Sequence, residues 1–152
     1  MVTITIYGLD QYTVGHYSKD HTKNLADLFE VDEDDINFVA PEAFVIHKGV
    51  EQTSWNAIVK VNAPQDLEPL QEKIAHYLIN TLKDFSIHLS VEFVYYHRHD
   101  RYESINEDYP RFLDESNLVN VEDEELPEGE ELYEGNIFEG YQEQLDEIYK
   151  EK

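Results

Sequence analysis

The run His97-Arg98-His99-Asp100 is the densest group of chemically capable side chains in the sequence. In an extended segment His97 and His99 project to the same side, and Asp100 could orient an imidazole or ligate an ion. Two imidazoles and a carboxylate could bind zinc or nickel, because a neutral ring nitrogen is a good ligand for either metal. Two histidines one residue apart are a weak motif without a third fixed ligand. We therefore interpret the tetrad as a solvated strand end, and we expect neither a metal nor a cofactor.

The tyrosines, 11 in total, are the second source of polar chemistry. Tyr95, Tyr96 and Tyr102 flank the tetrad and could line a ligand pocket at a strand end. The alternative is that these rings complete the core while their hydroxyls reach water. Cysteine is absent, and the sequence contains no phosphate-binding loop, dinucleotide-binding or serine-hydrolase motif.

The charge of the chain restricts its partners. The net charge is −23, and residues 103–152 hold 18 of the 34 acidic residues but 3 of the 11 basic ones. Such a surface repels phosphate backbones and anionic membranes, so we expect no binding to nucleic acid or to a membrane. The sequence has no apolar run of membrane-spanning length and no signal-peptide pattern at its start. We expect a soluble, cytoplasmic protein.

The first half of the chain reads as strand, helix, strand. Residues 2–8 alternate apolar and polar side chains, which predicts a strand that is buried on one face. A helix is expected from Ser18, whose hydroxyl can cap its N-terminus, and it ends before the acidic "VDEDD". Residues 36–47 are rich in β-branched and aromatic side chains, but Pro41 cannot donate to a strand ladder. We expect either an edge strand with a bulge at Pro41 or two short strands.

The second half repeats this order. Residues 55–61 predict a strand, Asp66 can cap a helix with Pro69 in its first turn, and residues 86–97 alternate as a final strand. The order βαβ–βαβ predicts an α+β domain over residues 1–103, in which two helices cover the apolar face of a four-stranded sheet. The opposite face carries polar side chains and must meet water.

Residues 104–152 predict an acidic extension beyond this domain. Apolar residues recur at helical spacing near its end, which predicts a helix over 137–150. An apolar stripe after an acidic linker indicates a docking helix. It could pack on its own protomer, on a neighbouring subunit or on another protein.

The sequence resembles the tautomerase/macrophage migration inhibitory factor superfamily. The resemblance lies in the two βαβ units, in the strand that starts at residue 2, and in the stretches "INFVAPEAFVIHKGVEQTSWNAIVKVNA" and "LSVEFVYYHRHDRYE". The resemblance is closest to a poorly characterised bacterial branch and covers residues 1–105. It implies a homotrimer whose sheets line a central channel, which would receive the polar face. A ferredoxin-like domain has the same element order and would more readily be a monomer or a dimer.

The resemblance also implies a site at the start of the first strand, where the superfamily uses the amine of a proline exposed by removal of Met. Val2 holds that position and could offer only a primary amine. The candidate pocket residues are Val2, Lys48, Tyr95, Tyr96, His97 and Tyr102. We expect an oligomeric scaffold or binding protein without keto–enol tautomerase activity. The alternative is an enzyme that enolises a small α-keto acid.

Overall fold

The computed structural model describes residues 1–113, so the predicted helix at 137–150 lies outside the described residues. The first half contains β1 (Val2–Tyr7), α1 (Gln11–Phe29), the 3₁₀ turn η1 (Glu33–Asp35) and β2 (Ile36–Val39). A hairpin of β3 (Ile46–His47) and β4 (Val50–Glu51) follows. The second half contains β5 (Asn56–Pro64), the 3₁₀ turn η2 (Gln65–Leu70), α2 (Gln71–Leu82), β6 (His88–Tyr96) and the 3₁₀ turn η3 (Arg98–Asp100).

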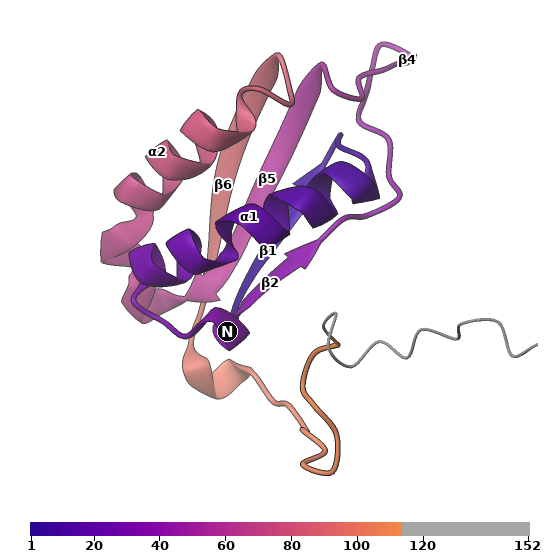
Figure 1. Ribbon diagram of the computed structural model, residues 1–152. Helices are drawn as coiled ribbons and strands as arrows, with labels where there is room; N and C mark the ends of the chain where they lie inside the picture. The colour runs from indigo at the N-terminus through magenta and orange to yellow at the C-terminus, as the bar shows by residue number, and fades with distance from the viewer. Residues whose placement is uncertain (114–152) are drawn as a thin grey trace, which may run out of the picture. The chain divides into compact units, whose positions relative to one another are not determined.

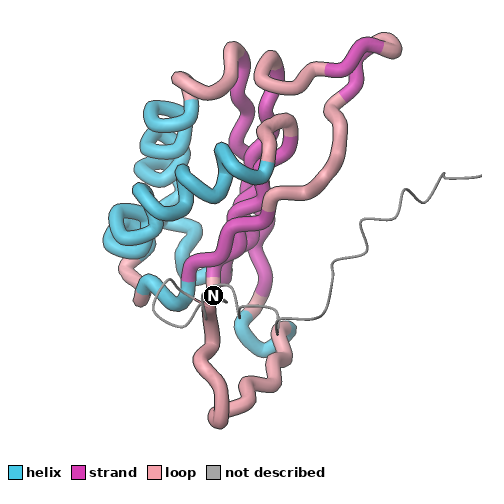
Figure 2. The backbone as a smooth tube through the Cα atoms, turned by 45° about the vertical axis from the view of Figure 1, so that its right-hand side comes forward, coloured by secondary structure: helices cyan, strands magenta, loops and turns pink. Residues whose placement is uncertain are grey.

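The main sheet has four strands in the order β2-β1-β5-β6. β1 pairs with β2 in parallel, β5 pairs with β6 in parallel, and β1 and β5 join the two halves in antiparallel fashion. Both helices lie on the same side of the sheet (Figures 1 and 2). The predicted α+β class, with two βαβ units and both helices on one face, is confirmed. The strands of each unit are neighbours, whereas a ferredoxin-like domain has split βαβ units, so that alternative is wrong.

The core lies between the sheet and the helices. Side chains alternate along a strand, so every second residue of β1 and β5 points toward the helices. The fully buried members of this set on the two central strands are Val2, Ile4, Ile6, Val59, Val61 and Ala63. Phe29 from α1, and Ile74, Leu78 and Leu82 from α2, close the same core. The alternation of apolar and polar side chains in β1 therefore corresponds to a strand with one face in the core.

Two side-chain hydrogen bonds join the helices above this core. The hydroxyls of Tyr17 and Thr81 lie 2.6 Å apart, and Nδ1 of His21 lies 2.7 Å from the hydroxyl of Tyr77. Burial raises the pKa of Tyr17 to about 12. The pairs give α1 and α2 polar contacts that apolar packing alone would not specify.

The opposite face of the sheet is polar and half-open. It carries Thr3 and Thr5 from β1, Lys60 from β5 and Glu92 from β6, and the last two form an ion pair of 3.9 Å. Among residues 1–113, both α-helices lie on the other face. This open face is the polar surface that the sequence predicts.

The first helix starts earlier than the sequence indicated. α1 begins at Gln11, and Asp10 is its N-cap, accepting from the backbone N–H groups of Tyr12 and Thr13 at 2.9 and 3.0 Å. The prediction that Ser18 caps the helix was wrong, since its hydroxyl donates to the carbonyl of Gly15 within the helix. The carboxylate cap and tertiary packing outweigh the poor helix propensity of the first turns.

Two further local predictions are resolved by the structure. Residues 36–47 form two short strands, because β2 stops before Pro41 and β3 pairs only with β4. Asp66 does not cap α2, as it was expected to do. It lies inside η2, where its carboxylate accepts from Arg98 instead.

The compact unit that holds the sheet runs from Met1 to Phe112. It includes Arg111, which donates to Glu103 at 3.2 Å. The division of the chain at residue 103 stays a prediction. In the part of the chain that the structure describes, no helix has the length and apolar character needed to cross a bilayer.

Candidate functional site

The structure brings some of the candidate residues together and separates others. Tyr96 ends β6 beside the start of β1, and His97 follows it at the beginning of η3. Tyr95 points to the helix side, where its hydroxyl donates to Gln71 at 2.8 Å. Tyr102 is 91% exposed.

Lys48 lies at the other end of the sheet. It forms the tip of the β3–β4 hairpin with Gly49, and both residues have positive φ, as a tight two-residue hairpin turn requires. The turn after this hairpin is tied to the residue that follows β1, since the N–H of Ser54 donates to the carbonyl of Gly8 at 2.9 Å. Lys48 therefore does not share a pocket with Val2.

Val2 is a core residue in this structure. It pairs with Ile36 in the parallel register of β1 and β2, and its exposed fraction is 0%. Its side chain points into the layer between sheet and helices. In the structure its nitrogen is the amide nitrogen of the peptide bond to Met1.

Three groups of Met1, the amine, the carbonyl and the thioether, contact neighbouring polar side chains. Its amine lies 3.5 Å from a carboxylate oxygen of Asp35, and its carbonyl accepts from the hydroxyl of Tyr96 at 2.5 Å. Its thioether accepts from Nδ2 of Asn37 and Nη2 of Arg101, both at 2.6 Å. Sulfur is a weak acceptor, so these donors position the side chain more than they stabilise it.

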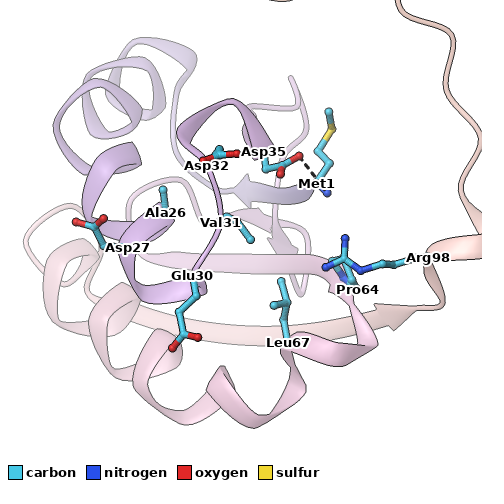
Figure 3. Close-up of a pocket in the computed structure, with 10 residues that line it drawn as sticks. All are labelled: Met1, Ala26, Asp27, Glu30, Val31, Asp32, Asp35, Pro64, Leu67 and Arg98. Atoms are coloured by element: carbon cyan, nitrogen blue, oxygen red, sulfur yellow. Dashed lines mark ion pairs between the residues drawn. The ribbon is translucent and has the colours of Figure 1, made fainter.

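A cavity of about 490 Å³ lies beside the amine of Met1 (Figure 3). It is bounded by the end of α1, the turn η1, the end of β5 and the start of η3. The residues that line it are Met1, Ala26, Asp27, Glu30, Val31, Asp32, Asp35, Pro64, Leu67 and Arg98. We call it the Met1 cavity.

The Met1 cavity is anionic. Four carboxylates line it, against the Met1 ammonium and Arg98. The guanidinium of Arg98 is already bidentate on Asp66, at 3.1 Å from Nε to Oδ1 and 2.7 Å from Nη2 to Oδ2. These hydrogen bonds lower the pKa of Asp66 and raise that of Arg98. The helix α1 also ends at this cavity, and its C-terminus adds partial negative charge.

This electrostatic environment bears directly on keto–enol chemistry. An α-keto acid carries a carboxylate, and the four carboxylates of the lining repel it, although water screens this repulsion at the exposed side chains of Asp27, Glu30 and Asp32. The Met1 ammonium is paired with Asp35, and Arg98 with Asp66. Among the described residues that line the cavity, each cationic group is therefore already paired with a carboxylate, and none is free to bind the carboxylate of a substrate.

The tetrad at 97–100 does not form a metal centre in the described residues. The rings of His97 and His99 stack with centroids 5.3 Å apart, and Nε2 of His99 lies 3.3 Å from Asp100. Residues 1–113 contain no group of three or more histidine, aspartate or glutamate side chains arranged to hold a metal ion. The two imidazoles face each other across a stack and do not converge on a shared point.

Sequence reasoning missed Asp35, Arg98 and Arg101 as neighbours of the N-terminal residue. A usable signal exists for Asp35, because parallel pairing of Val2 with Ile36 places the preceding residues, Met1 and Asp35, at the same edge of the sheet. That inference requires the strand order and the register. For the two arginines, nothing in the local sequence indicates a partner so far away in the chain.

No family model matches the chain, and no curated protein matches its sequence. A "domain of unknown function (DUF1904)" from Sebaldella termitidis has a TM-score of 0.61 at 18% identity and covers 68% of this chain and 95% of its own. A macrophage migration inhibitory factor-like protein from Entamoeba histolytica has a TM-score of 0.52 at 11% identity, covering 68% and 93%. Macrophage migration inhibitory factor from Toxoplasma gondii has a TM-score of 0.51 at 12% identity, covering 69% and 96%.

These likenesses define the class of fold. The chain has the fold of the tautomerase/macrophage migration inhibitory factor superfamily, as the sequence predicted. At these identities the comparisons establish architecture, and the chemistry of the Met1 cavity must be argued from its own residues.

Proposed function

We propose that this protein is an oligomeric scaffold or binding protein built on the tautomerase-like fold, and that it lacks keto–enol tautomerase activity. The carrying observation is the environment at the start of β1. Val2, at the position of the superfamily's catalytic proline, is a core residue, and the amine beside it is bound by Asp35 in an anionic cavity. A neutral basic amine and a site for a substrate carboxylate are the two things that keto acid enolisation needs there. The residues present argue against both.

A phenylpyruvate assay tests the catalytic half of the proposal. We expect the native chain to show no keto–enol conversion above the uncatalysed rate. We also expect Val2→Pro, with its N-terminus confirmed by mass spectrometry, to remain inactive, because the four carboxylates still repel the substrate. Adding Asp32→Asn and Asp35→Asn to Val2→Pro removes two of those charges and serves as the matched comparison.

The outcomes separate the two parts of the argument. Turnover by the native chain would overturn the proposal and favour the enzyme that enolises an α-keto acid. Turnover by Val2→Pro alone would leave the scaffold proposal standing but refute the electrostatic argument. Turnover by the triple variant only would support both parts.

The oligomeric half of the proposal is a homotrimer that forms through the open sheet face. That face offers apolar contact at Val94, which is 51% exposed, and at Val39, which is 42% exposed. Both belong to edge strands, β6 and β2, whose outer sides pair with no strand in residues 1–113. Unpaired edges are readily used for association between chains.

Light scattering tests the assembly. We expect a mass of about 54 kDa, three times the chain mass of 17.9 kDa. Val94→Glu should shift the mass toward one chain, because it adds a charge to the open face of an already acidic protein. Ile79→Glu is the matched control, since Ile79 is 42% exposed on α2, away from that face. A native mass of one chain, or equal effects of the two variants, would contradict the trimer.

A further inference from the structure

A second cavity, of about 430 Å³, lies at the end of the sheet opposite Met1. It is formed by the residues that follow β1, the loop that follows β2, and Thr53. β1 and β2 are adjacent and parallel, so both carboxyl ends open into it. We call it the Phe44 cavity after its most exposed aromatic residue.

Backbone hydrogen bonds hold the walls of this cavity in place. The carbonyl of Gly8 accepts from the N–H of Ser54 at 2.9 Å, which fixes the β1 end against the turn before β5. The N–H of Ala43 donates to the carbonyl of Pro41 at 2.8 Å, which closes a tight turn within the opposite loop.

The lining is largely apolar. Leu9, Ala40, Pro41 and Ala43 contribute aliphatic surface. Tyr12 and Phe44 add two aromatic rings that are 74% and 75% exposed. Large aromatic rings left this exposed beside a cavity of small-molecule size favour an apolar ligand.

The charges of the lining determine which sign of charge is favoured on that ligand. Asp10 and Glu42 are its two charged side chains, and no lysine, arginine or histidine is among the lining residues. Asp10 accepts from the backbone of Tyr12 and from the hydroxyl of Thr13, at 2.9 and 2.7 Å, and the Thr13 hydrogen bond lowers its pKa. Glu42 forms no ion pair with any basic group of residues 1–113.

The start of α1 offers an anion few free hydrogen-bond donors. The start of a helix usually offers free N–H donors to anions. Here the carboxylate of Asp10 occupies the N–H groups of Tyr12 and Thr13. Among the charged and aromatic groups of the lining, the carboxylate of Glu42 and the rings of Tyr12 and Phe44 remain uncommitted, and both kinds of group attract cations.

We propose that the Phe44 cavity binds a small organic cation, an apolar group that carries an ammonium or guanidinium. The apolar part packs against Phe44, Tyr12 and the aliphatic lining. The cationic part lies within reach of Glu42 and the aromatic faces. The site is independent of the Met1 cavity and of the assembly proposed above.

Titration of the full chain, labelled with ¹⁵N, tests this proposal by NMR. The probes are benzylammonium, benzyl alcohol and phenylacetate, which share a ring and differ in charge. We expect benzylammonium to shift the amide signals of Gly8, Leu9 and Glu42, and to bind about fivefold more tightly than benzyl alcohol. Phenylacetate should not bind. Raising the ionic strength should weaken the binding of benzylammonium and leave the binding of benzyl alcohol unchanged.

Substitutions assign the binding to this cavity. Glu42→Gln and Phe44→Ala should each weaken benzylammonium by about threefold to fivefold. Glu72→Gln is the matched control, because it removes one exposed carboxylate from α2 and should leave the affinity unchanged. Both pocket residues are exposed, and a native-like ¹⁵N spectrum of each variant confirms that the fold is retained.

Each contrary outcome overturns a stated part of the proposal. Equal affinity for benzylammonium and benzyl alcohol would refute the selection for charge. Shifts centred on the Met1 cavity, or an equal effect of Glu72→Gln, would refute the location. Tighter binding of N-acetylarginine amide than of benzylammonium would reassign the cavity to an arginine side chain of a partner protein.

Discussion

Replacing Gly8 with alanine is expected to lower the free energy of unfolding by about 2–4 kcal/mol. Gly8 has φ of +82°, a left-handed conformation that costs a residue with a Cβ. A Cβ at this position would also lie 2.5 Å from the backbone carbonyl oxygen of Asn56. Neither atom belongs to a flexible side chain, so relief requires the backbones of β1 and β5 to separate. Chemical denaturation followed by circular dichroism measures the loss.

Substitutions at two other glycines separate the conformational and steric contributions to this loss of stability. Gly49 has φ of +80° but open space around a Cβ, so Gly49→Ala reports the conformational cost alone, about 1 kcal/mol. Gly15 lies in α1 with nothing within 4 Å, so Gly15→Ala should stabilise by about 0.5–1 kcal/mol. If Gly8→Ala costs no more than Gly49→Ala, the close approach of β1 to β5 is not as tight as the structure has it.

The fold could be predicted because its signals are local and agree with each other. The alternation in β1 and β6 and the apolar stripe of α2 each follow from side-chain periodicity, which requires no knowledge of partners. Their order then restricts the architecture to a few candidates. Local signals failed where a distant contact decides the outcome. Asp66, a good helix cap by sequence, accepts from Arg98 instead.

The candidate site was harder to predict for the same reason. Its geometry depends on which strand ends meet, and Met1 meets Asp35 only because β1 and β2 are parallel and in a particular register. Tyr96 lies beside Met1 for a similar reason, because β6 runs parallel to β5 and ends at that edge. Lys48 was chosen from its place in the sequence near central strands. It lies far from Val2, since the β3–β4 hairpin joins the sheet at its other end.

Replacing Ile4 with alanine is the second change with a large expected effect, a loss of about 3–4 kcal/mol in the free energy of unfolding. Ile4 is 0% exposed at the centre of β1, opposite Phe38 of β2 and Val61 of β5. Two neighbouring strands, β2 and β5, and the helices above the sheet surround this position, so the cavity left by the side chain cannot collapse easily. The loss therefore includes both the transfer of the side chain and the unfilled volume.

Thr5 supplies the matched control on the same strand. It follows Ile4 directly, lies on the open face opposite Lys60, and is half-buried. Thr5→Ala should cost less than about 1 kcal/mol in dilute, dissociated protein, because that face borders water there. Under conditions in which the proposed trimer forms, the same substitution should cost more and should lower the concentration-dependent part of the stability. Equal losses for Ile4→Ala and Thr5→Ala in the dissociated chain would mean that both faces are covered within one protomer, which would remove the open face as the surface for assembly.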